Sequence, residues 1–142
     1  LASFILVLVS NCAVFASKTI DVYIIAGQSN ADGRGLVSDL TGPLSDYASI
    51  QPAIRLYYVN PTNGDPFNPA HRPGWVDLAP GYSVAPGFSG ALPSDRFGFE
   101  ISLGKSLAAL YPNRHIAFIK VSRGGTNLAN DWDPAGDSNY MW

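Results

Sequence analysis

The sequence predicts an α/β fold built around a parallel sheet, and three observations support that prediction. Three short runs rich in β-branched and aromatic residues, at 20–25, 54–59 and 115–121, have the composition of strands. A segment with helical periodicity separates the second run from the third, and the third is almost continuously apolar, as in a strand buried on both faces. The order strand, loop, strand, helix, strand fits parallel strands joined by right-handed crossovers.

The predicted helix covers residues 97–110. Ser94 or Asp95 can cap its start, and Pro112 ends it. Its apolar face is expected at Phe97, Ile101 and Ala108. If more strands follow beyond residue 142, the third strand is expected to expose an unpaired edge in this chain, which is an aggregation hazard.

Residues 60–93 form a long proline-rich segment without helical periodicity. Loops of that length are usually functional or disordered. Four aromatic residues favour order, because disordered chains lack them; they are Phe67, Trp75, Tyr82 and Phe88. These rings suit a wall on which a sugar stacks, but the simpler and favoured interpretation is that they hold the loop against the core.

Composition indicates a globular chain of 142 residues, with 46% hydrophobic and 14% charged residues and a net charge of −2. The nine Lys and Arg are scattered, which argues against nucleic acid as a partner. Because the chain begins at Leu1 and ends in a polar stretch at Trp142, we expect it to be the incomplete N-terminal part of a longer domain.

Residues 1–16 have the features of a secretory signal peptide whose positive start is missing. An apolar run at 4–9 precedes Val14 and Ala16, which fit a cleavage site after Ala16. A membrane anchor, a buried strand or lipid attachment at Cys12 are the alternatives, but the run is too short to span a bilayer and Asn11 interrupts it. We therefore expect a secreted or extracytoplasmic protein without stable membrane association after cleavage, with residues 17–142 as its mature part.

Cleavage would remove the only cysteine, and the two histidines do not form a metal site by themselves. No metal or other cofactor is expected. The glycine-rich stretch 31–35 lacks the spacing of a dinucleotide motif, so a phosphate- or flavin-binding domain is a weak alternative. Arg34 within it is interpreted as a solvated loop residue rather than a substrate contact.

Two polar turns follow predicted strands. Gln28-Ser29-Asn30 comes after the first strand, behind Gly27, and Gly124-Gly125-Thr126 comes after the third. By itself Gly-Gln-Ser-Asn is as readily an ordinary turn as a functional one. Because parallel strands end at the same edge of a sheet, Ser29 and the glycines are expected to be neighbours. A serine beside backbone N–H groups is what acyl transfer requires: a nucleophile and donors for an oxyanion.

Three motifs together resemble the sialate O-acetylesterase-like and acetylxylan-esterase branch of the SGNH hydrolases. They are Gly27-Gln28-Ser29-Asn30, Phe97-Gly98-Phe99-Glu100 at a helix start, and Gly124-Gly125-Thr126 with Trp132 downstream. The resemblance covers residues 19–133. It implies a flavodoxin-like three-layer α/β/α sandwich that hydrolyses O-acetyl esters on sugars, of the sialic acid or xylan type, through a serine acyl-enzyme.

By this resemblance Ser29 is the nucleophile, and its own N–H and that of Gly124 or Gly125 serve the oxyanion. Gln28 and Asn30 order the site.

Glu100 and Thr126 have supporting places in the same resemblance. Glu100 matches the acid of the family's Gly-Pro-Glu and ties the helix to neighbouring loops, although the helix dipole alone also favours a carboxylate there. Phe99 replaces the family's proline. Thr126 closes the glycine motif.

The family's general base and its orienting acid come from an Asp-x-x-His block that is absent from these 142 residues. His115 opens the third strand, at the opposite edge from Ser29, and His71 lies in the long loop; both are interpreted as structural or solvated. Because serine is a weak nucleophile without a base, this polypeptide alone is expected to be nearly inactive, with the block beyond Trp142.

Two functions follow from the sequence. The first is an exported serine esterase acting on acetylated carbohydrate. The second is a non-catalytic carbohydrate-binding domain on the same scaffold, since fold does not fix function. An Asp-x-x-His downstream of Trp142 would favour the first.

Overall fold

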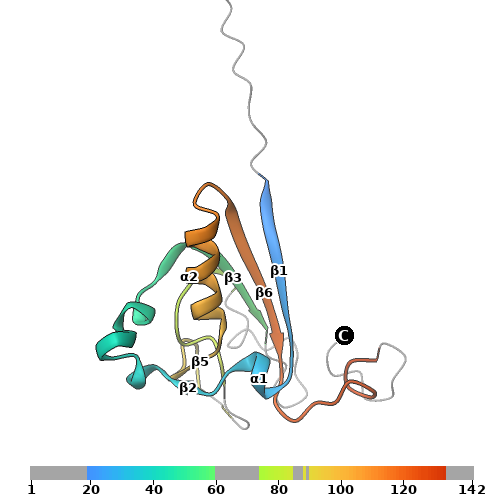
Figure 1. Cartoon of the computed structure of the whole chain (residues 1–142). Coiled ribbons are helices and arrows are strands. Elements are labelled where there is room, and N and C mark those ends of the chain that lie inside the picture. The colour runs from blue at the N-terminus through green and yellow to red at the C-terminus, as the bar shows by residue number, and fades with distance from the viewer. Residues whose placement is uncertain (1–18, 60–73, 85–87, 89, 134–142) are drawn as a thin grey trace, which may run out of the picture.

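The computed structural model describes residues 19–59, 74–84, 88 and 90–133 (Figure 1). In chain order the elements are β1 (Ile20–Gly27), α1 (Ser29–Asp32), β2 (Gly35–Leu36), the 3₁₀ helices η1 (Val37–Asp39) and η2 (Gly42–Ala48), β3 (Gln51–Val59), β4 (Trp75–Leu78), β5 (Arg96–Phe97), α2 (Glu100–Leu110) and β6 (His115–Ser122). The signal peptide predicted at 1–16 lies outside the described residues and stays a prediction.

The main sheet has the strand order β1-β6-β3-β4. β6 pairs in parallel with β1 on one side and with β3 on the other, which confirms the predicted α/β fold with parallel strands. The expected unpaired edge at residues 115–121 is wrong, because β6 is central and hydrogen-bonded on both sides. Its nearly continuous apolar sequence follows from this central position. The edges of the sheet are β1 and β4.

Two strand pairs involve segments in which the sequence predicts no strand. β4 runs antiparallel to β3, and Trp75 lies opposite Tyr57 with ring centroids 5.3 Å apart. β2 pairs antiparallel with β5. These strands have two to four residues, too few for a period to show in the sequence. The ring of Tyr82 packs edge-on to that of Tyr58 at 6.3 Å, so this aromatic residue holds its loop to the core as favoured.

Helix α2 begins three residues later than predicted. Phe97 belongs to β5, and Phe99 is the residue before the first turn. Ser94 does not cap the helix: its Oγ donates to the Ser83 carbonyl and accepts from the Arg96 N–H at 3.1 Å. The fully buried residues of the helix are Glu100, Ile101, Gly104 and Leu107. The predicted apolar residues Phe97 and Ala108 are partly buried and pack against the core, as expected, although Phe97 lies just before the helix.

Helix α2 lies across one face of the sheet (Figure 1). Gly104 lets it approach closely, since a Cβ there would overlap the Leu78 side chain and come within 3.0 Å of Ile54 Cδ1. On the other face of β1, Ile20, Val22 and Ile24 are 57%, 53% and 73% exposed. The described residues therefore show a helix on one face only, and the three-layer sandwich remains a prediction.

Candidate active site

The ends of β1 and β6 meet as the parallel topology requires. Gly27 is the register partner of Ser122, and the Arg123 N–H donates to the Gly27 carbonyl at 3.1 Å. The chain enters a polar turn on each side directly after this contact. The Ser29 turn and the Gly124-Gly125 turn therefore leave the sheet at the same edge.

The first turn is a single turn of helix that starts at Ser29. Gly27 has φ +153° and a Cβ there would lie 3.0 Å from Ala31 Cβ, so both the backbone angle and the packing favour glycine. The Asp32 and Gly33 N–H groups donate to the carbonyls of Gln28 and Ser29 at 2.9 and 2.8 Å. Ser29 is half-buried, whereas Gln28 and Asn30 are exposed. The sharp turn predicted after the strand is confirmed.

The second turn is fastened by the side chain of Thr126. Its Oγ1 donates to the Arg123 carbonyl at 2.9 Å and accepts from Trp132 Nε1 at 3.1 Å. Gly125 has φ +81°, and a Cβ there would meet no atom within 4 Å, so the backbone angle alone favours glycine. A cavity of about 430 Å³ is lined by Gln28 from the first turn, by Thr126 from the second and by Trp132.

A fully buried carboxylate lies directly behind the serine turn. Asp32 ends α1, and its Oδ1 accepts from Tyr58 Oη at 2.8 Å and Ser122 Oγ at 2.9 Å. Its Oδ2 accepts from Arg34 at 2.6 Å and from the Val84 N–H at 3.2 Å. Three donors from distant segments and the neighbouring Arg34 thus fix the end of a one-turn helix, which is far too short to be stable alone.

Lys120 is a second fully buried charge, on the central strand. Its three ammonium hydrogens are directed at three oxygens: the Asp32 carbonyl at 2.6 Å, the Tyr82 carbonyl at 2.8 Å and Ser83 Oγ at 2.8 Å. Glu100, also fully buried, places Oε2 3.0 Å from Nζ as a charge contact. Burial lowers the pKa of Lys120, and the Glu100 and Asp32 carboxylates act in the opposite direction.

Glu100 connects this lysine to the start of α2. Its Oε1 accepts from the Gly98 N–H at 2.9 Å, so the carboxylate links α2, its preceding turn and β6. Gly98 in turn lies against Gly33, where a Cβ would come within 2.5 Å of the Gly98 nitrogen and the Phe97 carbonyl. The close backbone contact fixes α1 relative to α2.

The interpretation of Arg34 as a solvated loop residue is wrong. Its side chain is 31% exposed, and its guanidinium donates to Asp32 at 2.6 Å and to the Val84 carbonyl at 2.6 Å. The cause is the buried carboxylate, which needs a cation nearby. Arg34 and Lys120 together balance the charges of Asp32 and Glu100.

His115, the histidine in the described part of the chain, does not approach Ser29. His115 pairs with Ile20 at the far end of β1, and seven residue steps of strand separate Ile20 from Gly27, roughly 23 Å. His71 lies outside the described residues, as does any block beyond Trp142. Among the described residues, no group of three or more His, Cys, Asp or Glu side chains is placed to hold a metal ion.

Sequence reasoning missed Asp32 and Lys120. A signal was present for Lys120, since a single lysine in an otherwise apolar central strand must have a buried partner or reach solvent. Asp32 gave no such signal, because Asp in a glycine-rich stretch is ordinary turn composition.

A protein-family model for carbohydrate esterases, described as sialic acid-specific acetylesterase, matches residues 19–142. The chain belongs to this family. Searches of curated proteins and of solved structures each gave no match.

Membership confirms the resemblance found in the sequence. It also supports, at the level of the family, an esterase whose substrate is acetylated carbohydrate. In the part of the chain that the structure describes, no helix combines the length and the apolar character needed to cross a membrane.

Proposed function

We propose that this chain carries the nucleophile of an exported serine esterase that removes acetyl groups from sugars. The observation that supports the proposal most is the meeting of the Ser29 turn with the Gly124-Gly125 turn, joined through the Arg123–Gly27 hydrogen bond of 3.1 Å. Membership in a carbohydrate esterase family gives the substrate class.

In the proposed reaction, Ser29 Oγ attacks the acetyl carbonyl carbon while a histidine supplied by residues beyond Trp142 takes the serine proton. The N–H groups of Ser29 and of Gly124 or Gly125 stabilise the oxyanion, and Gln28 and Asn30 order the turn. The ester C–O bond then breaks, and the sugar leaves as an alcohol with the proton from the histidine. Water hydrolyses the acetyl-serine and releases acetate.

Glu100 and Thr126 have supporting roles in this proposal. Glu100 holds the start of α2 and the central strand in place through Gly98 and Lys120. Thr126 holds the glycine turn through Arg123 and Trp132. Neither side chain takes part in the chemistry.

Replacement of the nucleophile tests the proposal in the full-length protein. Ser29→Ala is expected to lower kcat for 4-nitrophenyl acetate by about 10³-fold or more. Ser106→Ala, an exposed serine on α2, is the matched control and should keep the wild-type rate. A mass shift on the Ser29 peptide after treatment with phenylmethylsulfonyl fluoride is expected as a second readout.

A Ser29→Ala protein that hydrolyses the ester at the wild-type rate would refute the proposal. If the wild-type protein bound acetylated carbohydrate but did not hydrolyse the ester, a non-catalytic carbohydrate-binding domain would be the better description.

A further inference from the structure

A second cavity, of about 600 Å³, opens beside Ser29 and Asn30. Its volume is in the range of small-molecule sites. Besides Ile101 of α2, five apolar side chains line it, from the η1–η2 segment, from β5 and from the residue before α2: Leu40, Leu44, Tyr47, Phe97 and Phe99. We refer to these five residues as the apolar wall. None of them belongs to the segment 60–93, whose aromatic residues the sequence offered as a sugar wall.

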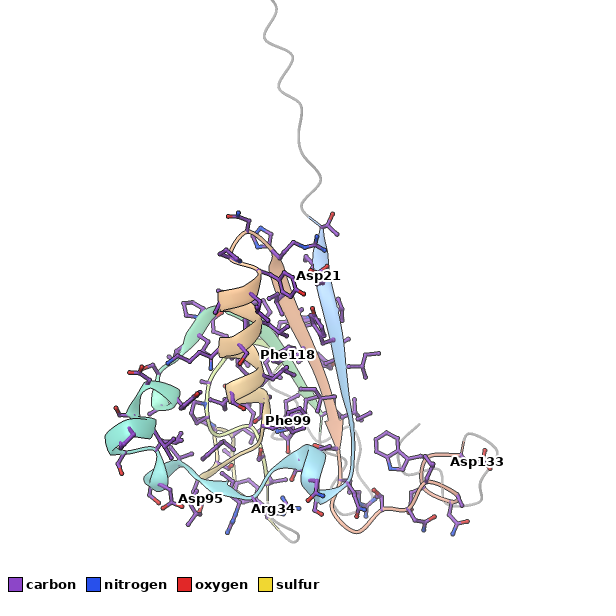
Figure 2. All side chains as sticks on the ribbon, viewed as in Figure 1. Asp21, Arg34, Asp95, Phe99, Phe118 and Asp133 are labelled. Carbon is purple, nitrogen blue, oxygen red and sulfur yellow. The ribbon has the colours of Figure 1, made fainter. Side chains whose placement is uncertain are left out.

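Two residues of the apolar wall are about half exposed to solvent. Phe99 is 48% exposed and Leu44 is 49% exposed. The backbone of Phe99 is held at the start of the helix, since its carbonyl accepts from the Leu103 N–H and Ser102 Oγ, both at 3.0 Å. Arg34 and Phe99 both lie toward the end of the sheet where α1 lies, whereas Asp21 marks the opposite end (Figure 2). A half-exposed aromatic ring that shares a cavity with the candidate nucleophile is typical of a ligand surface.

The other two rings of the apolar wall, Tyr47 and Phe97, have neighbouring residues that hold them. Lys105 Nζ lies 4.9 Å from the centroid of the Tyr47 ring and 3.2 Å from Asp46, so one side of that ring has a partner. The Phe97 ring lies over Gly35, where a Cβ would be 2.7 Å from its Cζ. Gly35 thus leaves room for the ring along the cavity.

The charges around this cavity are already paired. Arg34 is the charged residue among the described lining, and its guanidinium is committed to Asp32 at 2.6 Å and to the Val84 carbonyl. The remaining polar lining consists of hydroxyl and amide groups, from Ser29, Asn30 and Ser102. The cavity therefore offers ring faces and hydrogen-bond partners without a cation reserved for an anion.

We propose that this cavity is the subsite for the uncharged face of the substrate's sugar ring, with Phe99 as the platform on which the ring stacks. Sugar C–H groups suit the negative face of an aromatic ring, and the sugar hydroxyls suit Asn30 and Ser102. The inference rests on the proposed function, in which Ser29, one of the residues that line this cavity, is the nucleophile. The subsite would determine which sugar alcohol the enzyme accepts as the leaving group.

The test compares two acetyl esters on the full-length protein. A monoacetylated methyl xyloside carries an uncharged sugar ring, and ethyl acetate carries none. Phe99→Ala is expected to raise KM for the acetylated xyloside about tenfold, with kcat within about twofold, because an aromatic platform contributes to binding. The rate on ethyl acetate should stay within about twofold of wild type.

Two further variants separate an effect on the cavity from a general loss of protein stability. Tyr111→Ala removes a ring that is also 48% exposed, at the other end of α2. This variant should leave the KM for the xyloside and the rate on ethyl acetate unchanged. Gly35→Ala introduces a methyl group against Phe97 and narrows the cavity, so it should also raise KM for the xyloside.

The outcomes separate the subsite from the esterase. If Phe99→Ala and Gly35→Ala leave the xyloside KM unchanged, or lower the rates on both esters equally, the subsite is refuted while the role of Ser29 stands. If Ser29→Ala keeps its rate on ethyl acetate, the proposed function fails. In that case saturation-transfer NMR measures binding of the xyloside to Ser29→Ala. Loss of the signal in Ser29→Ala/Phe99→Ala supports the subsite, and an unchanged signal refutes it.

Discussion

Replacing Lys120 with methionine removes the charge at the centre of the buried cluster and keeps most of the side-chain volume. Three oxygens lose their donor, and the fully buried Glu100 carboxylate loses the cation 3.0 Å away. Glu100 would retain the Gly98 N–H at 2.9 Å. Breaking a buried ion pair on one side costs about 3–5 kcal/mol, because the remaining charge stays desolvated. That is a large share of the roughly 5–15 kcal/mol that stabilises a typical domain.

Urea unfolding followed by tryptophan fluorescence measures this loss, as a lower midpoint with an unchanged m-value. Lys105→Met is the control, because Lys105 is 44% exposed and pairs with Asp46 at the surface; we expect about 1 kcal/mol or less. The double variant Lys120→Met/Glu100→Gln removes both charges and should recover part of the loss, which gives the coupling energy of the pair.

Equal costs for Lys120→Met and Lys105→Met would refute the reasoning, because a buried and a surface ion pair would then be equivalent. A double variant whose cost is the sum of the two single costs would show that Lys120 and Glu100 do not interact.

Two other predictions concern the backbone contact beside the site and the far end of the sheet. Gly33→Ala is expected to lower the free energy of unfolding by about 2–5 kcal/mol, from its φ of +97° and overlap with the Gly98 backbone, whereas Gly42→Ala, with φ +54° and open space, carries only the backbone cost of about 1–2 kcal/mol. Equal losses in urea unfolding would disprove the contact. Hydrogen bonds from Arg114, at 2.8 and 2.5 Å, and then its charge hold the pKa of Asp21 below 3.8. The pair's contribution to stability is present above pH 3.8 and is lost as pH falls through the lowered pKa. In an NMR titration Arg114→Gln should move the Asp21 pKa upward, and an unchanged pKa would contradict the ion pair.

Much of the sheet and part of the site were predictable from the sequence. The three principal strands have strong local signals, and their parallel arrangement brings two strand ends to one edge. Ser29 and Gly124-Gly125 could therefore be paired before any coordinates were known. The start of α2 could not be placed, because Phe97 pairs with Gly35 in a two-residue strand, and these residues are far apart in sequence.

The sequence by itself determined the fold class, the family and the turns of the candidate site, because these depend on local composition, short motifs and strand order. Only the tertiary structure decided the central place of β6, the buried cluster and the apolar wall beside Ser29. Asp32, Lys120 and Glu100 come from three separate segments, and each has an ordinary local explanation. They interact because the folded chain buries them together, where an unpaired charge is costly. No short stretch of sequence can show this, because the cost arises only when the three segments pack against one another.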